Sequence, residues 1–223
     1  MKIEASFVTS AASASDLPRG GLAEIALVGR SNVGKSSLIN ALVRQKLART
    51  SGEPGKTRLA NVYRIARGSA PAIHLVDLPG YGYARRLKAE GAGLISEPSF
   101  DEIARAVFER NPAALLLVDS RHPGLESDRA AWEWVSSAAS AGAVVATKID
   151  KLARGERIRA LRQLESVFDS VVVPVSAATG EGMDELWNLI DRLAKPPQRN
   201  RSSNSSRRPH QNQTARPGLP KRK

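Results

Sequence analysis

A glycine-rich pattern that could bind the phosphates of a nucleotide runs from Gly29 to Ser36. It reads GRSNVGKS, matches GxxxxGK[ST], and lies between an apolar run and a helical run. Its backbone N–H groups and the helix N-terminus would hold phosphate oxygens, Lys35 would reach the β and γ phosphates, and the Ser36 hydroxyl would ligate Mg²⁺. The alternative is a glycine turn that only caps a helix. The candidate residues are Gly29, Arg30, Ser31, Asn32, Val33, Gly34, Lys35, Ser36 and Ser37.

Two more polar elements could complete a phosphate and Mg²⁺ site. In Asp77-Leu-Pro-Gly80, the carboxylate would hold Mg²⁺ through water and the Gly80 amide would sense the γ phosphate. In Gly55-Lys56-Thr57, the Thr57 hydroxyl would join the Mg²⁺ shell only when the γ phosphate is present. Each element alone could be an ordinary loop. Together they predict that Lys35, Thr57 and Gly80 act on the γ phosphate during catalysis.

A third group of residues could select the base. Thr147-Lys148-Ile-Asp150 follows an apolar run, and the Asp150 carboxylate could accept hydrogen bonds from N1 and the 2-amino group of guanine. Adenine has neither donor, so a polar pocket of this kind would discriminate by as much as ~10⁴-fold. Ser176-Ala177-Ala178 could supply the backbone amide that reads guanine O6. The sequence therefore predicts a guanine nucleotide, GTP or GDP, as the ligand.

Short apolar runs alternate with longer amphipathic ones, which predicts an α/β domain with a mostly parallel sheet and helices on both faces. We expect six strands, at 24–29, 60–66, 73–77, 114–119, 143–147 and 171–175. We expect helices near 36–45, 100–110, 126–141, 156–168 and 182–194. Residues 60–66 alternate in polarity, as an antiparallel edge strand with one solvated face does. The motifs stand after strands, where such sheets bind ligands.

Composition excludes several other classes of protein. The 223 residues include 41% hydrophobic residues, no cysteine and three histidines, which fits one globular domain and excludes disulfide scaffolds and thiolate zinc sites. No apolar run approaches the ~20 residues of a membrane span, and the first sixteen residues lack the apolar core of a signal peptide. We therefore expect a cytoplasmic protein with no membrane contact.

The positive charge is concentrated at the C-terminus. The chain carries 34 Lys and Arg against 22 Asp and Glu, a formal net charge of +12. Nine of these cations and no acid lie in residues 195–223, a segment rich in Pro, Ser, Asn and Gln. We expect a disordered basic tail at 195–223, after an N-terminal extension (1–22) and a nucleotide-binding domain (23–194). Such a tail could contact RNA, or serve only as a solubilising terminus.

The ordered motifs resemble those of the EngB (YihA/YsxC) family of bacterial ribosome-biogenesis GTP-binding proteins. The stretches that carry the resemblance are GRSNVGKSS (29–37), LARTS (47–51), PGKT (54–57), VDLPGYGYA (76–84), DSRHP (119–123) and TKIDK (147–151). The resemblance covers about residues 5–194. It implies a three-layer, Ras-like P-loop GTPase fold of the TRAFAC class, with GTP or GDP and Mg²⁺ as ligands. Thr147 departs from the usual Asn, and residues 85–99 do not match the family pattern.

The resemblance also implies a biological role. It implies GTP hydrolysis coupled to late assembly of the large ribosomal subunit, with the subunit precursor and its rRNA as partners, and a possible need in cell division and septation. We expect a monomer without DNA specificity. Two alternatives are a basic RNA-binding module whose nucleotide site is structural, and a GTPase of tRNA modification.

The sequence also bears on the hydrolytic step. Tyr81 follows Gly80 where many GTPases place a water-orienting glutamine, so we expect slow intrinsic hydrolysis. Asn32 could help to hold a K⁺ ion near the phosphates, in which case K⁺ or ribosomal particles would stimulate hydrolysis. Its alternative role is loop geometry, because Asn tolerates turn conformations. We expect Asp119 and Arg121 to pair locally, and His74 to be a core residue.

Overall fold

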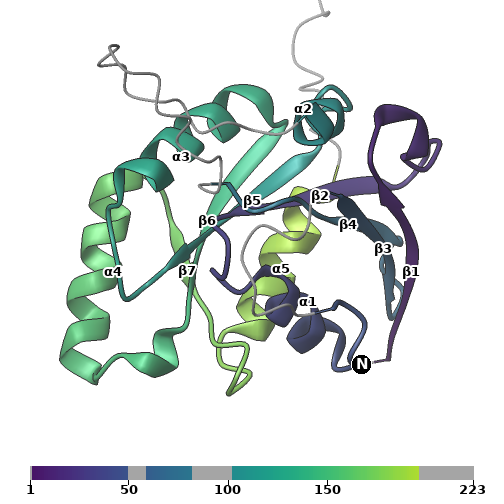
Figure 1. Cartoon of the computed structure of the whole chain (residues 1–223). Coiled ribbons are helices and arrows are strands. Elements are labelled where there is room, and N and C mark those ends of the chain that lie inside the picture. Colours follow the sequence, from purple (N-terminus) through teal and green to yellow (C-terminus); the bar gives the residue numbers. More distant parts are fainter. Residues whose placement is uncertain (1, 50–58, 82–101, 196–223) are drawn as a thin grey trace, which may run out of the picture.

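The computed structural model describes residues 2–49, 59–81 and 102–195, which form an α/β fold with a seven-stranded sheet (Figure 1). The strand order is β1-β3-β4-β2-β5-β6-β7. The strands are β1 (Ile3–Ala11), β2 (Ala23–Gly29), β3 (Ala60–Arg67), β4 (Ile73–Asp77), β5 (Ala113–Asp119), β6 (Ala141–Thr147) and β7 (Val172–Pro174). The α-helices are α1 (Lys35–Val43), α2 (Glu102–Phe108), α3 (Glu126–Ala138), α4 (Arg154–Phe168) and α5 (Met183–Leu193).

Strands β4 and β5 are buried along their whole length because helices cover both faces of the sheet. All seven residues of β5 are buried, and so are all five of β4. Parallel pairing of β2 with β4 and β5, and of β5 with β6, requires crossover connections, and helices supply several of these. The continuous apolar runs of the sequence therefore mark the middle of the sheet.

Helices on the two faces complete three layers, as the sequence predicted (Figure 1). Helices α1 and α5 pack on one face, where Leu38 and Ile190 meet alternate residues of the central strands. Helices α2, α3 and α4 pack on the other face, where Val107, Val135 and Leu164 join the second core cluster. Burial of this kind contributes roughly 25 cal/mol per Å² of apolar surface. No helix in the described part of the chain is long and apolar enough to cross a membrane.

The sheet has one strand more than the six that the sequence predicted. Strand β1 comes from residues assigned to the N-terminal extension, and it pairs antiparallel with β3. Strand β3 also pairs antiparallel with β4, so it is the antiparallel strand, but β1 and not β3 forms the edge. Most residues of β1 are exposed or half-buried, so its sequence lacks the apolar run by which the other strands were recognised.

The parallel strands bring the predicted motifs together at their carboxyl ends. Strands β2, β4, β5 and β6 all end on this side of the sheet, at Gly29, Asp77, Asp119 and Thr147 respectively. Loops beyond the carboxyl ends of neighbouring parallel strands lie side by side, which is where open α/β sheets bind ligands. His74 lies within β4 and is 7% exposed, which confirms it as a core residue.

Candidate functional site

The phosphate loop connects β2 to α1 and depends on unusual backbone geometry. Gly34 has φ 112° and precedes the first residue of α1, and Asn32 has φ 62°. Both values lie in the left-handed region, which glycine adopts without strain and Asn tolerates better than most residues. A Cβ on Gly29 would lie 2.8 Å from Val33 Cγ1 and 3.0 Å from the Leu117 carbonyl, so only glycine fits there.

Lys35, the first residue of α1, folds back over this loop. Its Nζ donates hydrogen bonds to the backbone carbonyls of Gly29 (3.1 Å) and Arg30 (3.4 Å). Burial lowers the pKa of Lys35, and the Asp77 carboxylate opposes that shift. Lys35 is 9% exposed, and in the described part of the chain its ammonium group contacts only neutral carbonyls, so it is suited to an anionic partner.

Ser36 and Asp77 meet beside Lys35, as the sequence predicted for a Mg²⁺ site. Ser36 Oγ donates to Asp77 Oδ2 over 3.0 Å. The other oxygen, Asp77 Oδ1, is buried and has no hydrogen-bond partner among the described residues. Burial raises the pKa of Asp77, whereas Lys35 and Ser36 oppose the shift. A hydroxyl next to a buried carboxylate oxygen in need of a partner fits a hard cation such as Mg²⁺, which binds through few protein oxygens and several waters.

Gly80 lies against the phosphate loop with no room for a side chain. A Cβ at this position would lie 2.7 Å from the Ser31 backbone nitrogen and 2.8 Å from Ser31 Oγ. The next residue, Tyr81, forms an isolated parallel bridge with Arg30. The Tyr81 hydroxyl points into the core and donates to Asp128 Oδ1 over 2.8 Å. The phosphate loop and the Asp77–Gly80 loop are therefore in direct contact.

The residues predicted to read the base lie after β6 and β7. Ser176 is fully buried, and its Oγ donates to Asp150 Oδ1 over 2.7 Å while accepting from the Thr179 amide. Lys151 Nζ lies 3.2 Å from Asp150 Oδ2. The Ser176 hydrogen bond, together with Lys151, lowers the pKa of Asp150 despite the opposing effect of burial. Asp150 is thus held as an oriented carboxylate, the form that accepts two donors.

Thr147 links the predicted base-reading segment (147–150) to the phosphate loop. It stands where the motif of most GTPases has Asn. Its Oγ1 lies 2.8 Å from the Val33 carbonyl and 3.1 Å from the Val118 carbonyl. The hydroxyl carries one hydrogen, so the two carbonyls share a single donor. Thr147 is 4% exposed, so the arrangement is shielded from water.

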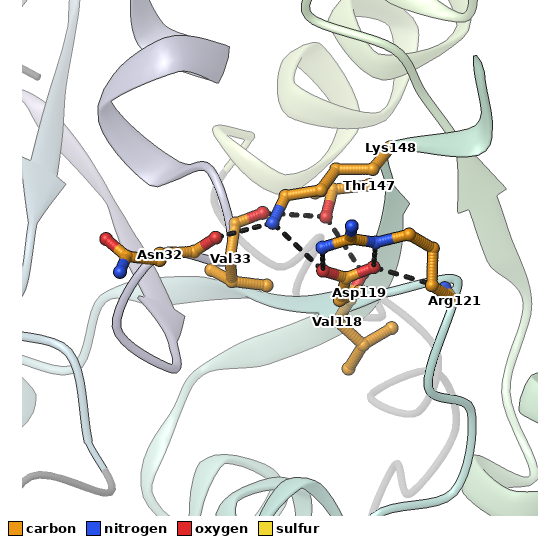
Figure 2. Close-up of polar contacts among 7 residues, drawn as sticks. All are labelled: Asn32, Val33, Val118, Asp119, Arg121, Thr147 and Lys148. Carbon is orange, nitrogen blue, oxygen red and sulfur yellow. Dashed lines mark hydrogen bonds and ion pairs between the residues drawn. The ribbon is translucent and has the colours of Figure 1, made fainter. Parts of the chain in front are cut away.

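Sequence reasoning missed a second link across the site, in which Lys148 is the central residue (Figure 2). Lys148 Nζ donates to the Asn32 backbone carbonyl over 2.6 Å and to Asp119 Oδ2 over 2.9 Å. Arg121 pairs with both oxygens of Asp119, at 2.9 Å from Nε and 2.7 Å from the terminal nitrogen, which confirms the predicted local pair. Burial would raise the pKa of Asp119, but hydrogen bonds from Arg121 and Lys148 hold it well below its usual range. The sequence signals were the DSRHP motif, which contains Asp119 and Arg121, and the TKIDK motif, which contains Lys148.

A cavity of about 190 Å³ opens beside this cluster. Its lining combines residues of the phosphate loop, the end of β5 and the loop after it, and the residue after β6, and three of its side chains are cationic. The lining residues are Arg30, Ser31, Asn32, Val33, Asp119, Arg121, His122 and Lys148. Gly55, Lys56 and Thr57, the remaining predicted elements of the site, lie outside the described residues.

The chain is similar in sequence to known GTP-binding proteins. The profile of a family described as "50S ribosome-binding GTPase" matches residues 24–148. The chain is 43% identical over 198 residues to the probable GTP-binding protein EngB of Pelotomaculum thermopropionicum, a match that covers 86% of this chain and 96% of that protein. It is 42% identical over 205 residues to the probable GTP-binding protein EngB of Anaeromyxobacter sp. strain K, covering 86% and 92%.

Solved structures share the fold. A variant of Aquifex aeolicus Era bound to GDP and AlF4⁻ aligns with a TM-score of 0.64 at 24% identity, over 78% of this chain and 57% of that chain. A crystal structure of a probable GTP-binding protein EngB aligns with a TM-score of 0.52 at 23% identity, over 77% and 98%. These structures support a P-loop GTPase fold, and the sequence identity to its relatives shows that the chain belongs to the EngB family of GTP-binding proteins.

Proposed function

We propose that the protein hydrolyses GTP to GDP and phosphate as a switch in assembly of the large ribosomal subunit. The GTP-bound form would dock on a subunit precursor and its rRNA, and hydrolysis would release it. One observation carries the proposal. Lys35, Ser36 and Asp77 meet at the carboxyl ends of the strands. On the same side of the sheet, Ser176 orients the carboxylate of Asp150. The description of the matching family, "50S ribosome-binding GTPase", supports the ribosomal part.

In this proposal the phosphate loop performs the chemistry largely by position and charge. Lys35 Nζ exchanges the Gly29 and Arg30 carbonyls for β and γ phosphate oxygens, which are stronger acceptors because they are charged. Ser36 would ligate Mg²⁺ and Asp77 would hold it through water, and the ion would neutralise charge on the phosphate oxygens. Thr57 would join that shell, and the Gly80 amide would contact the γ phosphate. Water then attacks the γ phosphorus, and the bond to the bridging oxygen breaks.

In this proposal, residues after β6 and β7 form the guanine pocket. Asp150 accepts from N1 and the 2-amino group, while Ser176 holds its carboxylate in place. The Ser176 amide already donates to the Glu181 carbonyl, so the amide that reads O6 comes from Ala177 or Ala178. Thr147 and Lys148 keep this pocket in register with the phosphate loop.

Hydrolysis without a stimulating factor should be slow. The Tyr81 hydroxyl is engaged by Asp128 and so cannot orient the attacking water. Asn32 is exposed, and its side-chain amide points away from Lys148 (Figure 2), so it is available to ligate K⁺. We propose that K⁺ or ribosomal particles stimulate hydrolysis. Equal rates in NaCl and KCl, with and without particles, would contradict this.

The cellular setting is part of the same proposal. We propose a cytoplasmic monomer that is also needed for normal division and septation, because a defect in subunit assembly would limit growth. The basic segment 195–223 would add salt-sensitive, nucleotide-independent affinity for RNA. A structural nucleotide site in a general RNA-binding module, or a role in tRNA modification, remains as the alternative function.

Sedimentation distinguishes these functions. Full-length protein is mixed with lysate particles in GDP or in a non-hydrolysable GTP analogue, at two salt concentrations. A matched variant carries serine at every Lys and Arg of residues 199–223. Co-migration of both proteins with large-subunit particles, only with the analogue, would support the switch. Binding that needs the tail cations, ignores the nucleotide and disappears with salt would overturn it in favour of a general RNA binder.

A further inference from the structure

A buried hydrogen bond between Tyr81 and Asp128 is not explained by nucleotide binding alone. Tyr81 is 4% exposed and Asp128, in the first turn of α3, is 2% exposed. Their contact is 2.8 Å long. A buried carboxylate costs free energy unless it is paired, and a phenylalanine with a small apolar partner would fill the same space without that cost. The pair therefore calls for a role beyond packing.

Three contacts hold residues 80 and 81 in place. Gly80 lies so close to the Ser31 amide that a Cβ would approach it to 2.7 Å. Tyr81 forms a backbone bridge with Arg30 of the phosphate loop. The side chain of Tyr81 then runs from this bridge to Asp128 on α3. Backbone contacts on one side and a side-chain hydrogen bond on the other leave the Gly80 peptide little freedom.

The electrostatics support an ordered contact. Burial raises the pKa of Asp128, and the Tyr81 hydrogen bond and the nearby Arg30 oppose the shift. Burial, followed by the Asp128 charge, raises the pKa of Tyr81. The Tyr81 hydroxyl therefore keeps its proton, and it is the donor to the carboxylate when Asp128 is ionised. A hydrogen bond to a charged group is stronger than a neutral one.

We infer that Asp128 is a positioning residue for γ-phosphate recognition, acting through Tyr81 to hold the Gly80 amide against the phosphate loop. The inference rests on the proposed role of Gly80 as the amide that contacts the γ phosphate. Preorganisation of this amide favours GTP over GDP, because only GTP carries the group that the amide would contact. Loss of the hydrogen bond should therefore weaken triphosphate binding selectively.

Tyr81→Phe tests the inference, because it removes the hydroxyl and keeps the ring. Dissociation constants for fluorescent GDP and fluorescent GTPγS are measured on the full-length protein with Mg²⁺. We expect the GTPγS affinity to fall by about tenfold while the GDP affinity stays within about twofold. Asp128→Ala should give the same selective loss. Asp128→Asn should retain most of the GTPγS affinity, because its side-chain oxygen can still accept from Tyr81.

A matched control uses another hydrogen bond of α3. Trp132 Nε1 donates to the Phe168 carbonyl over 3.1 Å, and Trp132→Phe removes that bond without touching residues 80 and 81. This variant should lower stability and leave the GTPγS to GDP affinity ratio unchanged. Equal loss of both nucleotides in Tyr81→Phe, an unchanged ratio, or tighter GTPγS binding would overturn the inference. If the affinity ratio is unchanged while wild type and variants still bind GDP, the role of Asp128 is wrong but the proposed nucleotide site is not.

Discussion

Lys148, in the segment that is to read the base, donates a 2.6 Å hydrogen bond to the backbone carbonyl of Asn32 in the phosphate loop. Asp119, at the end of β5, holds the same ammonium from the other side at 2.9 Å. The side chain of Lys148 thus links the predicted base-reading segment to the phosphate loop and to the end of β5. Loss of these contacts is therefore expected to affect both parts of the candidate site.

Lys148→Met should weaken GDP and GTP to the same extent. The change removes two hydrogen bonds of a charged donor and keeps much of the aliphatic stem, so we expect about a tenfold loss for each nucleotide. Equilibrium titration with fluorescent GDP and GTPγS measures the effect. Arg162→Met, at an exposed position of α4, is the control. A loss confined to GTPγS would contradict a role in joining the two ends.

Asp150→Asn should move base preference from guanine toward xanthine. An amide can donate to the 2-oxo group of xanthine, whereas it cannot accept both guanine donors. The Asn side-chain oxygen can still accept from Ser176, so the pocket should keep its shape. Competition of XDP and GDP for the same site measures the preference. A variant that still prefers GDP would show that Asp150 is not the base-reading residue.

Thr147→Val should destabilise the fold. Valine keeps the shape but leaves the buried carbonyls of Val33 and Val118 without their shared donor, and an unpaired buried group costs about 1–3 kcal/mol. Urea unfolding measures the free energy difference. Thr179→Val, at an exposed position, should change it by less than about 0.5 kcal/mol. Equal effects of the two substitutions would contradict a stabilising role for the Thr147 hydroxyl.

Asp119→Asn should lower stability in a pH-dependent way. Arg121 and Lys148 depress the pKa of Asp119, so the carboxylate stabilises the folded state at any pH above its unfolded pKa of about 3.9. That contribution is lost as the pH falls below about 4, toward the folded pKa. Urea unfolding at pH 7, 5, 4 and 3 should show a wild-type advantage that is constant down to pH 5 and shrinks at pH 3. Glu133→Gln, at an exposed position, is the control. A constant difference at every pH would contradict the ion-pair explanation.

Local patterns predicted most of the site because its parts are local structures. The GRSNVGKS motif has glycine at position 29, where a side chain would clash, and at position 34, where φ is positive. Both requirements can be recognised within the eight residues of the motif. Asp77 and Thr147 were placed correctly because each ends an apolar run, and parallel strands bring such ends together. Strand β1 escaped prediction because its residues are mostly exposed and its pairing with β3 depends on a segment far along the chain.

The sequence by itself determined the α/β class, the order of the motifs and the side-chain types offered at Lys35, Ser36, Asp77 and Asp150, because residue type and periodicity encode these directly. Only the tertiary structure decided how the motifs are joined. Tyr81 reaches Asp128 across 47 residues, and Lys148 reaches Asn32 across 116. No local rule predicts such pairs, because they depend on where the packing of helices against the sheet places each loop.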